Sequence, residues 1–284
     1  MLQFFVRREP KISFVKRKMP RLAYVCRVDG RHGQVPRAMH LHEERAEAVL
    51  VLQGSGSYNI AEKQYTAQAG DVLFFNSGVL HDETAVEDRD IVTLCIAVQG
   101  LELHGCRRNA LLPENIAPLV HLGEDFSSVE RMFSLLVDSV ARHEPAELLE
   151  YLTQALIVKL ADCASRHGEP FVPIKEDLGL RIKDYIDAHY CEQLALPQMA
   201  GVLGINAYYL AHAFKEKTGY APMQYVTRRR IGEAQNQLIN TERSITEIAM
   251  HCGYNNSNYF QRVFHTVVGM SPGQYRKYWI EEME

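Results

Sequence analysis

The chain has 284 residues, a formal net charge of −4 and an isoelectric point of about 6.3. This length is enough for two domains, each with its own hydrophobic core. No apolar run approaches the roughly 20 residues of a membrane-spanning helix, and no apolar signal segment follows the basic N-terminus. The six cysteines are scattered without a CxxC pair, as is usual for reduced cytosolic proteins. We therefore expect a cytoplasmic protein with no membrane partner.

Residues 1–21 form a basic arm, in which seven lysines and arginines stand against one acid, Glu9. This charge is typical of a partly disordered tail. The next region, residues 22–204, carries a net charge of −12 and is therefore opposite in sign to the arm.

Residues 22–126 are predicted to form a β domain. Short runs rich in β-branched and apolar residues occur at 49–52, 56–60, 71–75 and 91–98, and glycine and asparagine separate them. This spacing is typical of a small barrel or jelly roll. Phe74 and Phe75 point to opposite faces of their strand, so at least one of them is expected in the core.

Two motifs in this β domain resemble those of the cupin superfamily. The first is His40-x-His42, four residues, Glu47, six residues and Gly54. The second is Gly70, five residues and Asn76-x-Gly78-x-x-His81. It departs from the usual pattern at Asn76, where proline is common, and at Ala85, where an asparagine is common. The resemblance implies a cupin barrel that brings both motifs together.

The two motifs supply three imidazoles and one carboxylate: His40, His42, His81 and Glu47. These side chains can hydrogen-bond a small polar effector such as a sugar, and we predict them as effector-binding residues. The same set also matches the ligands that a divalent transition metal prefers. A metal sensor or a metal-dependent enzyme is therefore the alternative interpretation.

Residues 127–167 are predicted to form a pair of helices. Ser127 and Glu130 have the spacing of a capping box that would begin the first helix, and residues 146–166 form the second. The pair either covers the barrel or makes a dimer contact. The glycine- and proline-containing segment 168–175 is the predicted linker to a C-terminal domain, 176–280.

The C-terminal region contains an internal repeat with a shift of 50 residues. Tyr259, Phe264, Gly269 and Pro272 repeat Tyr209, Phe214, Gly219 and Pro222. Each copy has two amphipathic helices separated by a glycine turn, which predicts a helix-turn-helix unit. Residues 222–240 are predicted as one connecting helix, about 28 Å long at 1.5 Å per residue. Such a spacer suits recognition helices roughly 34 Å apart, one turn of duplex DNA.

This region resembles the signature of the AraC/XylS transcription regulators. The resemblance rests on Gly253-Tyr254, Tyr259-Phe260-x-x-Val263-Phe264, Gly269-Met270-Ser271-Pro272 and Tyr275-Arg276. It implies a ligand-responsive regulator, without enzymatic activity, that binds double-stranded DNA as a homodimer and contacts RNA polymerase if it is an activator. It also implies that the basic arm can fold over the effector or touch the DNA-binding domain.

Charge and helix phase select the residues that contact DNA. Residues 205–280 have a net charge of +5, as phosphate contact requires. The outer faces of the two recognition helices offer the predicted base-reading residues Tyr208, His212, Asn258, Gln261 and Arg262. The predicted phosphate contacts are Asn206, Arg228, Arg230 and Asn256, although Glu233 or Glu216 could instead pair with one of the arginines. Relatives commonly carry arginine at the place of His212, so the first unit is expected to discriminate bases less than the second.

Overall fold

The computed structural model describes residues 14–15, 19–29, 37–61, 63–83, 91–171 and 177–281. Most of the predicted basic arm, residues 1–13 and 16–18, lies outside the described residues. Residues 172–175 of the predicted linker also lie outside them.

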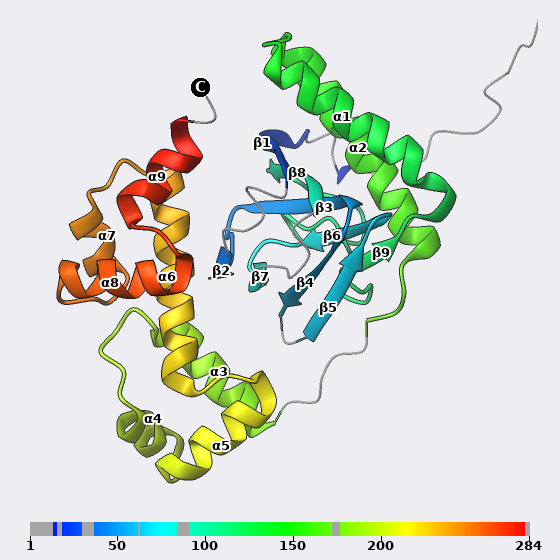
Figure 1. Cartoon of the computed structure of the whole chain (residues 1–284). Coiled ribbons are helices and arrows are strands. Elements are labelled where there is room, and N and C mark those ends of the chain that lie inside the picture. Colours follow the sequence, from blue (N-terminus) through cyan, green and yellow to red (C-terminus); the bar gives the residue numbers. More distant parts are fainter. Residues whose placement is uncertain are drawn as a thin grey trace, which may run out of the picture.

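The N-terminal region folds into two antiparallel sheets that face each other (Figure 1). One sheet has the order β1-β8-β3-β6-β9 and the other β2-β7-β4-β5. The strands of the first sheet are β1 (Arg21–Val28), β8 (Val92–Gln99), β3 (Arg45–Gln53), β6 (Asp71–Phe75) and β9 (Leu119–His121). Those of the second are β2 (Arg37–His40), β7 (His81–Glu83), β4 (Ser55–Ile60) and β5 (Lys63–Gln68). The predicted jelly-roll-like domain is confirmed as two sheets rather than a closed barrel.

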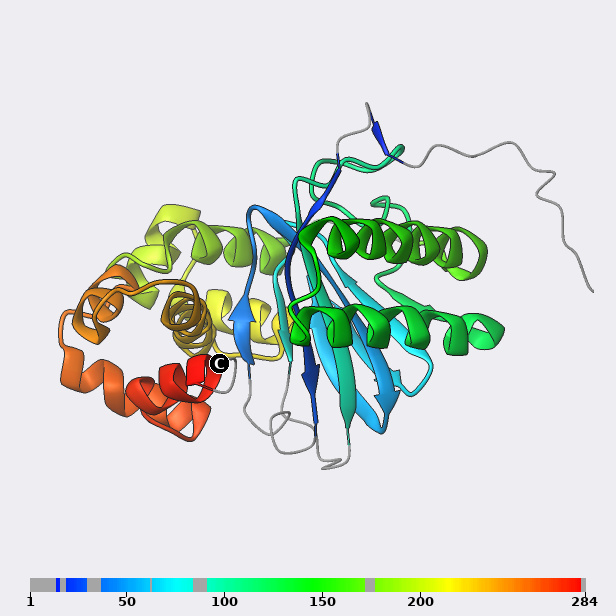
Figure 2. The same cartoon turned by 90° about the horizontal axis from the view of Figure 1, so that it is seen from above.

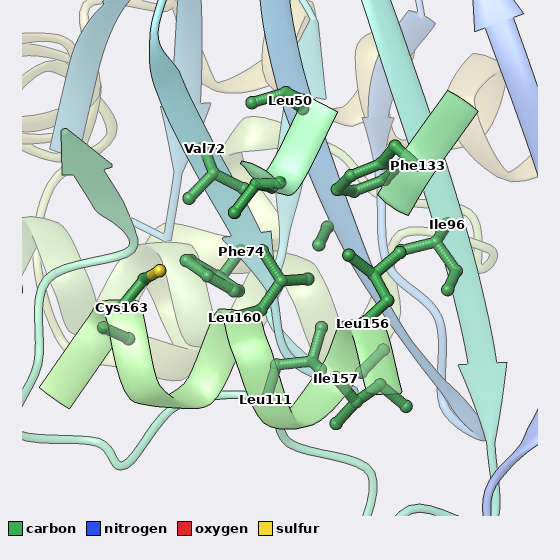
Figure 3. Packing of buried hydrophobic residues seen from close by; sticks show 14 of the residues in the cluster. Leu50, Val72, Phe74, Ile96, Leu111, Phe133, Leu156, Ile157, Leu160 and Cys163 are labelled. Carbon is green, nitrogen blue, oxygen red and sulfur yellow. The ribbon is translucent and has the colours of Figure 1, made fainter. Parts of the chain in front are cut away.

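Two helices, α1 (Phe126–Ala141) and α2 (Ala146–His167), cover the outer face of the five-stranded sheet (Figure 2). Figure 3 shows Phe74 of this sheet packed with Leu160 of α2. The next residue, Phe75, points between the two sheets, so both phenylalanines are buried because the sheet has a core on each face. The predicted capping box at Ser127 is wrong. The helix begins at Phe126, directly after a turn at Gly123–Asp125, which places Ser127 inside the helix.

The C-terminal region is entirely helical in the described residues, and the predicted double helix-turn-helix is confirmed. Its helices are α3 (Leu178–His189), α4 (Leu196–Leu203), α5 (Ala207–Thr218), α6 (Pro222–Asn240), α7 (Ile245–His251), α8 (Ser257–Val268) and α9 (Pro272–Glu281). The signals that limit these helices are local. Asn206 and Asn256 cap α5 and α8, and Ser244 with Glu247 forms a capping box at the start of α7. Gly204 takes a φ of 69° at the turn between α4 and α5, a conformation that glycine adopts without steric cost.

The two-sheet domain lies between α1–α2 on one side and the helices α3–α9 on the other (Figure 2). Strand β2 makes the main contact of the sheets with α6 (Figure 1). In the predicted linker, the Phe171 amide donates to the Asn115 carbonyl and Pro170 pairs with Ile116, so residues 170–171 lie against the sheet domain. Within the described residues, no helix combines the length and apolarity needed to cross a membrane.

Candidate functional site

The structure brings together the three histidines of the cupin-like motifs. His40 ends β2 and His81 begins β7, and these two residues are direct partners in the antiparallel pairing. His42 follows two residues after β2. All three side chains are buried, and each offers a ring nitrogen within 4.8 Å of the others. The strands therefore place an imidazole cluster at the side of the sheet domain that faces the C-terminal helices.

The hydrogen bonds of His40 and His81 fix which ring nitrogen carries the proton. Nδ1 of His40 lies 2.9 Å from the Ala38 carbonyl oxygen, and Nδ1 of His81 lies 2.9 Å from the Val79 carbonyl oxygen. Because a carbonyl can only accept, both Nδ1 atoms must donate, which leaves an Nε2 lone pair on each neutral ring. Both Nε2 atoms are buried without a hydrogen-bond partner among the described residues. Two acceptor atoms are thus available to a ligand.

Glu47, on β3 of the opposite sheet, completes the predicted group. Its Oε1 accepts from His42 Nε2 at 2.9 Å, from the Tyr24 hydroxyl at 2.5 Å and from Arg45 Nε at 3.1 Å. Sequence reasoning missed Tyr24 and Arg45. Arg45 could have been found, since it lies two residues before Glu47 on the same face of a strand. Tyr24 could not, because β1 gave no strong strand signal.

Burial sets the protonation state of the cluster. It lowers the pKa of His40 well below its usual value, an effect that His81 increases, and it lowers the pKa of His81 to about 3. Burial also lowers the pKa of His42. For Glu47, burial opposes ionisation, but the hydrogen bond from His42 helps to hold the carboxyl pKa well below its usual value. At neutral pH the site therefore combines neutral imidazoles with an ionised carboxylate.

A cavity of about 190 Å³ lies beside the cluster, between the four-stranded sheet and the C-terminal helices. His81 lines it, together with polar groups of Asn59, Asp82 and Lys183. Of the two departures from the cupin pattern, Asn76 has a structural role: its amide nitrogen donates to the Leu112 carbonyl and its oxygen accepts from the Leu111 amide. Ala85 lies outside the described residues.

The predicted base-reading residues lie on α5 and α8. Tyr208 is 83% exposed, and His212, Asn258 and Arg262 are exposed, whereas Gln261 is half-buried. His212 Nδ1 lies 3.8 Å from a Glu216 carboxylate oxygen on the same helix. The neighbouring Tyr209 is also exposed, at 53%. Both recognition helices thus present their polar outer faces to solvent.

The predicted phosphate contacts are held by other parts of the protein. The side chains of Asn206 and Asn256 accept from backbone amides as helix caps. Arg228 forms an ion pair at 3.4 Å with Asp82, a fully buried residue of β7. Its partner is thus Asp82 rather than Glu233 or Glu216, the two alternatives offered by the sequence. Sequence spacing could not reveal it, because Asp82 belongs to the other domain.

Arg230 is likewise engaged within the protein. Its Nε donates to the Tyr190 carbonyl at 2.7 Å and its Nη2 to the Glu192 carbonyl at 2.6 Å. The guanidinium also lies over the Tyr254 ring. Arg230 therefore ties α6 to the segment before α4.

Comparisons with known proteins agree with this two-part architecture. A model of the AraC-like ligand binding domain matches residues 22–156, and a model of a helix-turn-helix domain matches residues 199–278. The HTH-type transcriptional activator RhaR of Klebsiella pneumoniae is 27% identical over 266 residues, covering 91% of this chain and 94% of that protein. The uncharacterized HTH-type transcriptional regulator YdiP of Escherichia coli is 27% identical over 270 residues, covering 93% and 88%.

A similarity among solved structures involves the C-terminal domain of AraT, a response regulator from Geobacillus stearothermophilus. It is 32% identical and covers 36% of this chain and 86% of that chain, with a TM-score of 0.36. Taken with the two domain models, the full-length relatives define a transcription regulator that joins a ligand-binding domain to a DNA-binding domain. The chain belongs to the AraC/XylS family, as its sequence motifs predict.

The buried histidines should make the sensor domain sensitive to mild acid. Their pKa values are depressed in the folded state, so the unfolded chain binds protons first as the pH falls below about 6.5. The free energy of unfolding should then fall by about 1.4 kcal/mol per pH unit for each imidazole that stays neutral. Urea denaturation between pH 7.5 and 5.5 measures this slope. The double variant His40→Gln, His81→Gln should show a shallower slope, and equal slopes would contradict the assignment.

Proposed function

We propose that this regulator senses a ligand held by His40, His42, His81 and Glu47. The observation that supports the proposal is the pair of buried Nε2 lone pairs on His40 and His81, which have no partner among the described residues. Leaving two buried acceptors unpaired costs free energy, and a bound ligand would recover it. The named relatives are transcription regulators, and we infer that this chain likewise catalyses no reaction.

A small polar effector is the first candidate for the ligand. It would occupy the cavity beside the cluster and would reach the cluster through His81, the member of the four that lines this cavity. Asn59 and Asp82 supply further polar groups there. The volume of about 190 Å³ is below the roughly 300 Å³ at which pockets for drug-sized ligands begin. This limits the effector to a small molecule, such as a monosaccharide or a small acid.

A divalent transition metal is the second candidate, and the spacing of the cluster supports it. The rings of His40 and His81 are in contact, with centroids 4.3 Å apart, which leaves no room for an organic molecule between them. An ion bound at about 2.1 Å from each nitrogen fits such a space. His40, His42 and His81 would hold it, and Glu47 would orient the His42 ring through its hydrogen bond to Nε2. The Nδ1 bonds of His40 and His81 to carbonyls are the usual outer support of metal-binding imidazoles. The ion would link the strands that carry the histidines, and its binding could serve as the signal that the regulator senses.

Elemental analysis of protein purified without chelator distinguishes the two ligands. The metal proposal expects close to one zinc or other transition ion per chain in the wild type and none in His40→Ala, His81→Ala. His104→Ala, an exposed histidine of the same domain, is the control and should keep the ion. A metal-free wild type whose melting temperature rises with a sugar or small acid, but not in the double variant, would support the organic effector. A metal-free wild type that no such ligand stabilises would contradict both.

The second helix-turn-helix unit, we infer, carries most of the base discrimination. Arg262 and Asn258 are exposed on α8 and can bond guanine and adenine through two hydrogen bonds each. On α5, His212 lies next to Glu216 and has fewer donors to offer. Tyr208 extends into solvent and suits contact with a thymine methyl or a phosphate. Gln261 and the caps Asn206 and Asn256 complete the proposed interface.

Arg262→Ala should relax base preference more than His212→Ala. Loss of a bidentate contact removes about 1–3 kcal/mol of discrimination at one base pair. Selection of binding sites from random duplexes by the full-length variants measures this directly. Arg181→Ala, which removes a charge from α3 outside both recognition helices, is the control. The opposite ranking of Arg262 and His212 would show that the first unit is the specific one.

A second copy of the chain is the proposed partner of α2. Leu148, Tyr151, Ala155 and Val158 are exposed on this helix at alternating spacings of three and four residues. This is the spacing of the apolar seam through which helices pair in a coiled coil. The finding favours a dimer contact in addition to the covering of the sheet. A DNA-bound dimer in the cytoplasm that contacts RNA polymerase as an activator is the arrangement we propose.

Replacing the exposed stripe should dissociate the dimer. Tyr151→Glu with Val158→Glu places two charges on the seam, where a partner helix would have to desolvate them. Sedimentation velocity should show a dimer for the wild type and a monomer for the double variant. Glu150→Lys, which changes a charge off the stripe, should remain dimeric. A wild type that is monomeric at all concentrations would overturn the assignment.

A further inference from the structure

Strand β2 lies unusually close to the connecting helix α6. At Gly232, in the middle of α6, an added Cβ would overlap the carbonyl group of Met39 and approach that of Ala38. Any other residue at this position would push the strand and the helix apart. The contact therefore depends on this glycine, whose use inside a helix costs about 1 kcal/mol relative to alanine.

Side chains of α6 form hydrogen bonds with the backbone groups on the outer edge of β2. Gln235 Oε1 accepts from the Ala38 amide at 2.8 Å, and Arg229 Nη1 donates to the Met39 carbonyl at 3.2 Å. Arg229 is itself buried and pairs with Asp187 of α3 at 2.8 Å. β2 is an edge strand of its sheet, so α6 takes the place that a neighbouring strand would occupy. The interface is specific in its polar groups as well as in its shape.

The side chains of β2 enter three different environments in sequence. Ala38 belongs to the core of the second helix-turn-helix unit, with Ile231, Leu238 and Phe260. Met39 belongs to the core of the first unit, with Ile182, Phe214 and Tyr225. His40 belongs to the imidazole cluster of the proposed ligand site. Three consecutive residues thus connect that site to both DNA-binding units.

This contact leaves the recognition surfaces open. Tyr208 on α5 and Arg262 on α8 are exposed although β2 is docked, so the sensor domain does not cover them. Docking instead completes the two hydrophobic cores that flank α6. Removing Ala38 and Met39 would leave a gap in each core, which destabilises the neighbouring helices.

We propose that β2 is a brace that holds the two helix-turn-helix units in the relative position required to engage two successive segments of DNA. Through His40 the same strand couples DNA binding to occupancy of the ligand site, a step that rests on the function proposed above. The coupling needs no change in the recognition helices themselves. It needs only that α6 and β2 be docked or separated, a two-state element that both sites can bias.

The test uses the full-length chain with Gly232→Ala, and Gly201→Ala is its matched control. Gly201 lies inside α4, where an added Cβ meets nothing within 4 Å, so both variants gain the same helix propensity. Gln235→Leu, which removes the acceptor for Ala38 without adding bulk, is the second variant, and thermal unfolding establishes that each variant is folded. Affinity is measured for a duplex selected by the wild type. It is also measured for the same duplex with the segment that contacts one of the two helix-turn-helix units scrambled.

Gly232→Ala and Gln235→Leu should weaken binding to the intact duplex about tenfold relative to Gly201→Ala, within the usual range of coupling between sites. Binding to the scrambled duplex should change by less than about twofold, because one unit suffices there. Hydrogen exchange should show that the intact duplex protects the amides of residues 37–42 in the wild type but not in Gly232→Ala.

Two outcomes would overturn the brace. One is unchanged affinity and exchange in both variants while the wild type still binds its selected duplex. The other is tighter binding by Gly232→Ala, which would make the docked state inhibitory. Failure of the proposed function gives a different result. If the histidine variants change neither the metal content nor the stabilisation by ligand, the ligand site is wrong, but the DNA-binding and hydrogen-exchange results for Gly232→Ala still test the brace.

Discussion

Burial of the five-stranded sheet on both faces is the constraint on which the rest of this structure depends. Along β3, alternate residues enter the core beneath α1 and α2 and the core between the two sheets. Glu47 falls on the inner side, so its carboxylate is desolvated and must find donors within the protein. Those donors come from β1, from β3 itself and from the loop after β2. The site is therefore a product of strand register as much as of its own residues.

The same constraint explains why the sensor and DNA-binding regions are in such close contact. With helices on one face of the sandwich, β2 lies at the opposite side, where α6 packs against it. Ion pairing adds to this contact, since Arg228 reaches the buried carboxylate of Asp82. Arg228, which the sequence predicts as a phosphate contact, thus forms an ion pair with a buried carboxylate of the sensor domain instead. This pairing adds a counter-charge to the hydrogen bonds that the Asp82 carboxylate accepts from Asn59.

The helical half could be predicted from sequence because its signals are local. Asparagine and serine caps, glycine turns and prolines at helix starts fix the bounds of α4 to α9 within a few neighbouring residues. The three histidines and Glu47 could be selected from motif spacing. The short strands β2, β7 and β9 could not be found, since three or four residues carry too little periodicity. Contacts across the domain boundary, such as Arg228 with Asp82, have no signature in one sequence. The capping box predicted at Ser127 is wrong because the turn at Gly123–Asp125 leads directly into the helix, which begins one residue before Ser127.

The insertion of Ala38 and Met39 into the two helix-turn-helix cores has a consequence for how such proteins can be recombined. Two domains that are joined by a short linker can be exchanged as modules when each completes its own hydrophobic core. In this chain, the hydrophobic cores of the DNA-binding half include Ala38, Met39 and Leu80, three buried residues that come from the sensor domain. A domain boundary at residues 168–175 would separate those cores from the sensor-domain residues that complete them. The structural unit that could be transferred to another sensor is the C-terminal half together with a strand equivalent to β2.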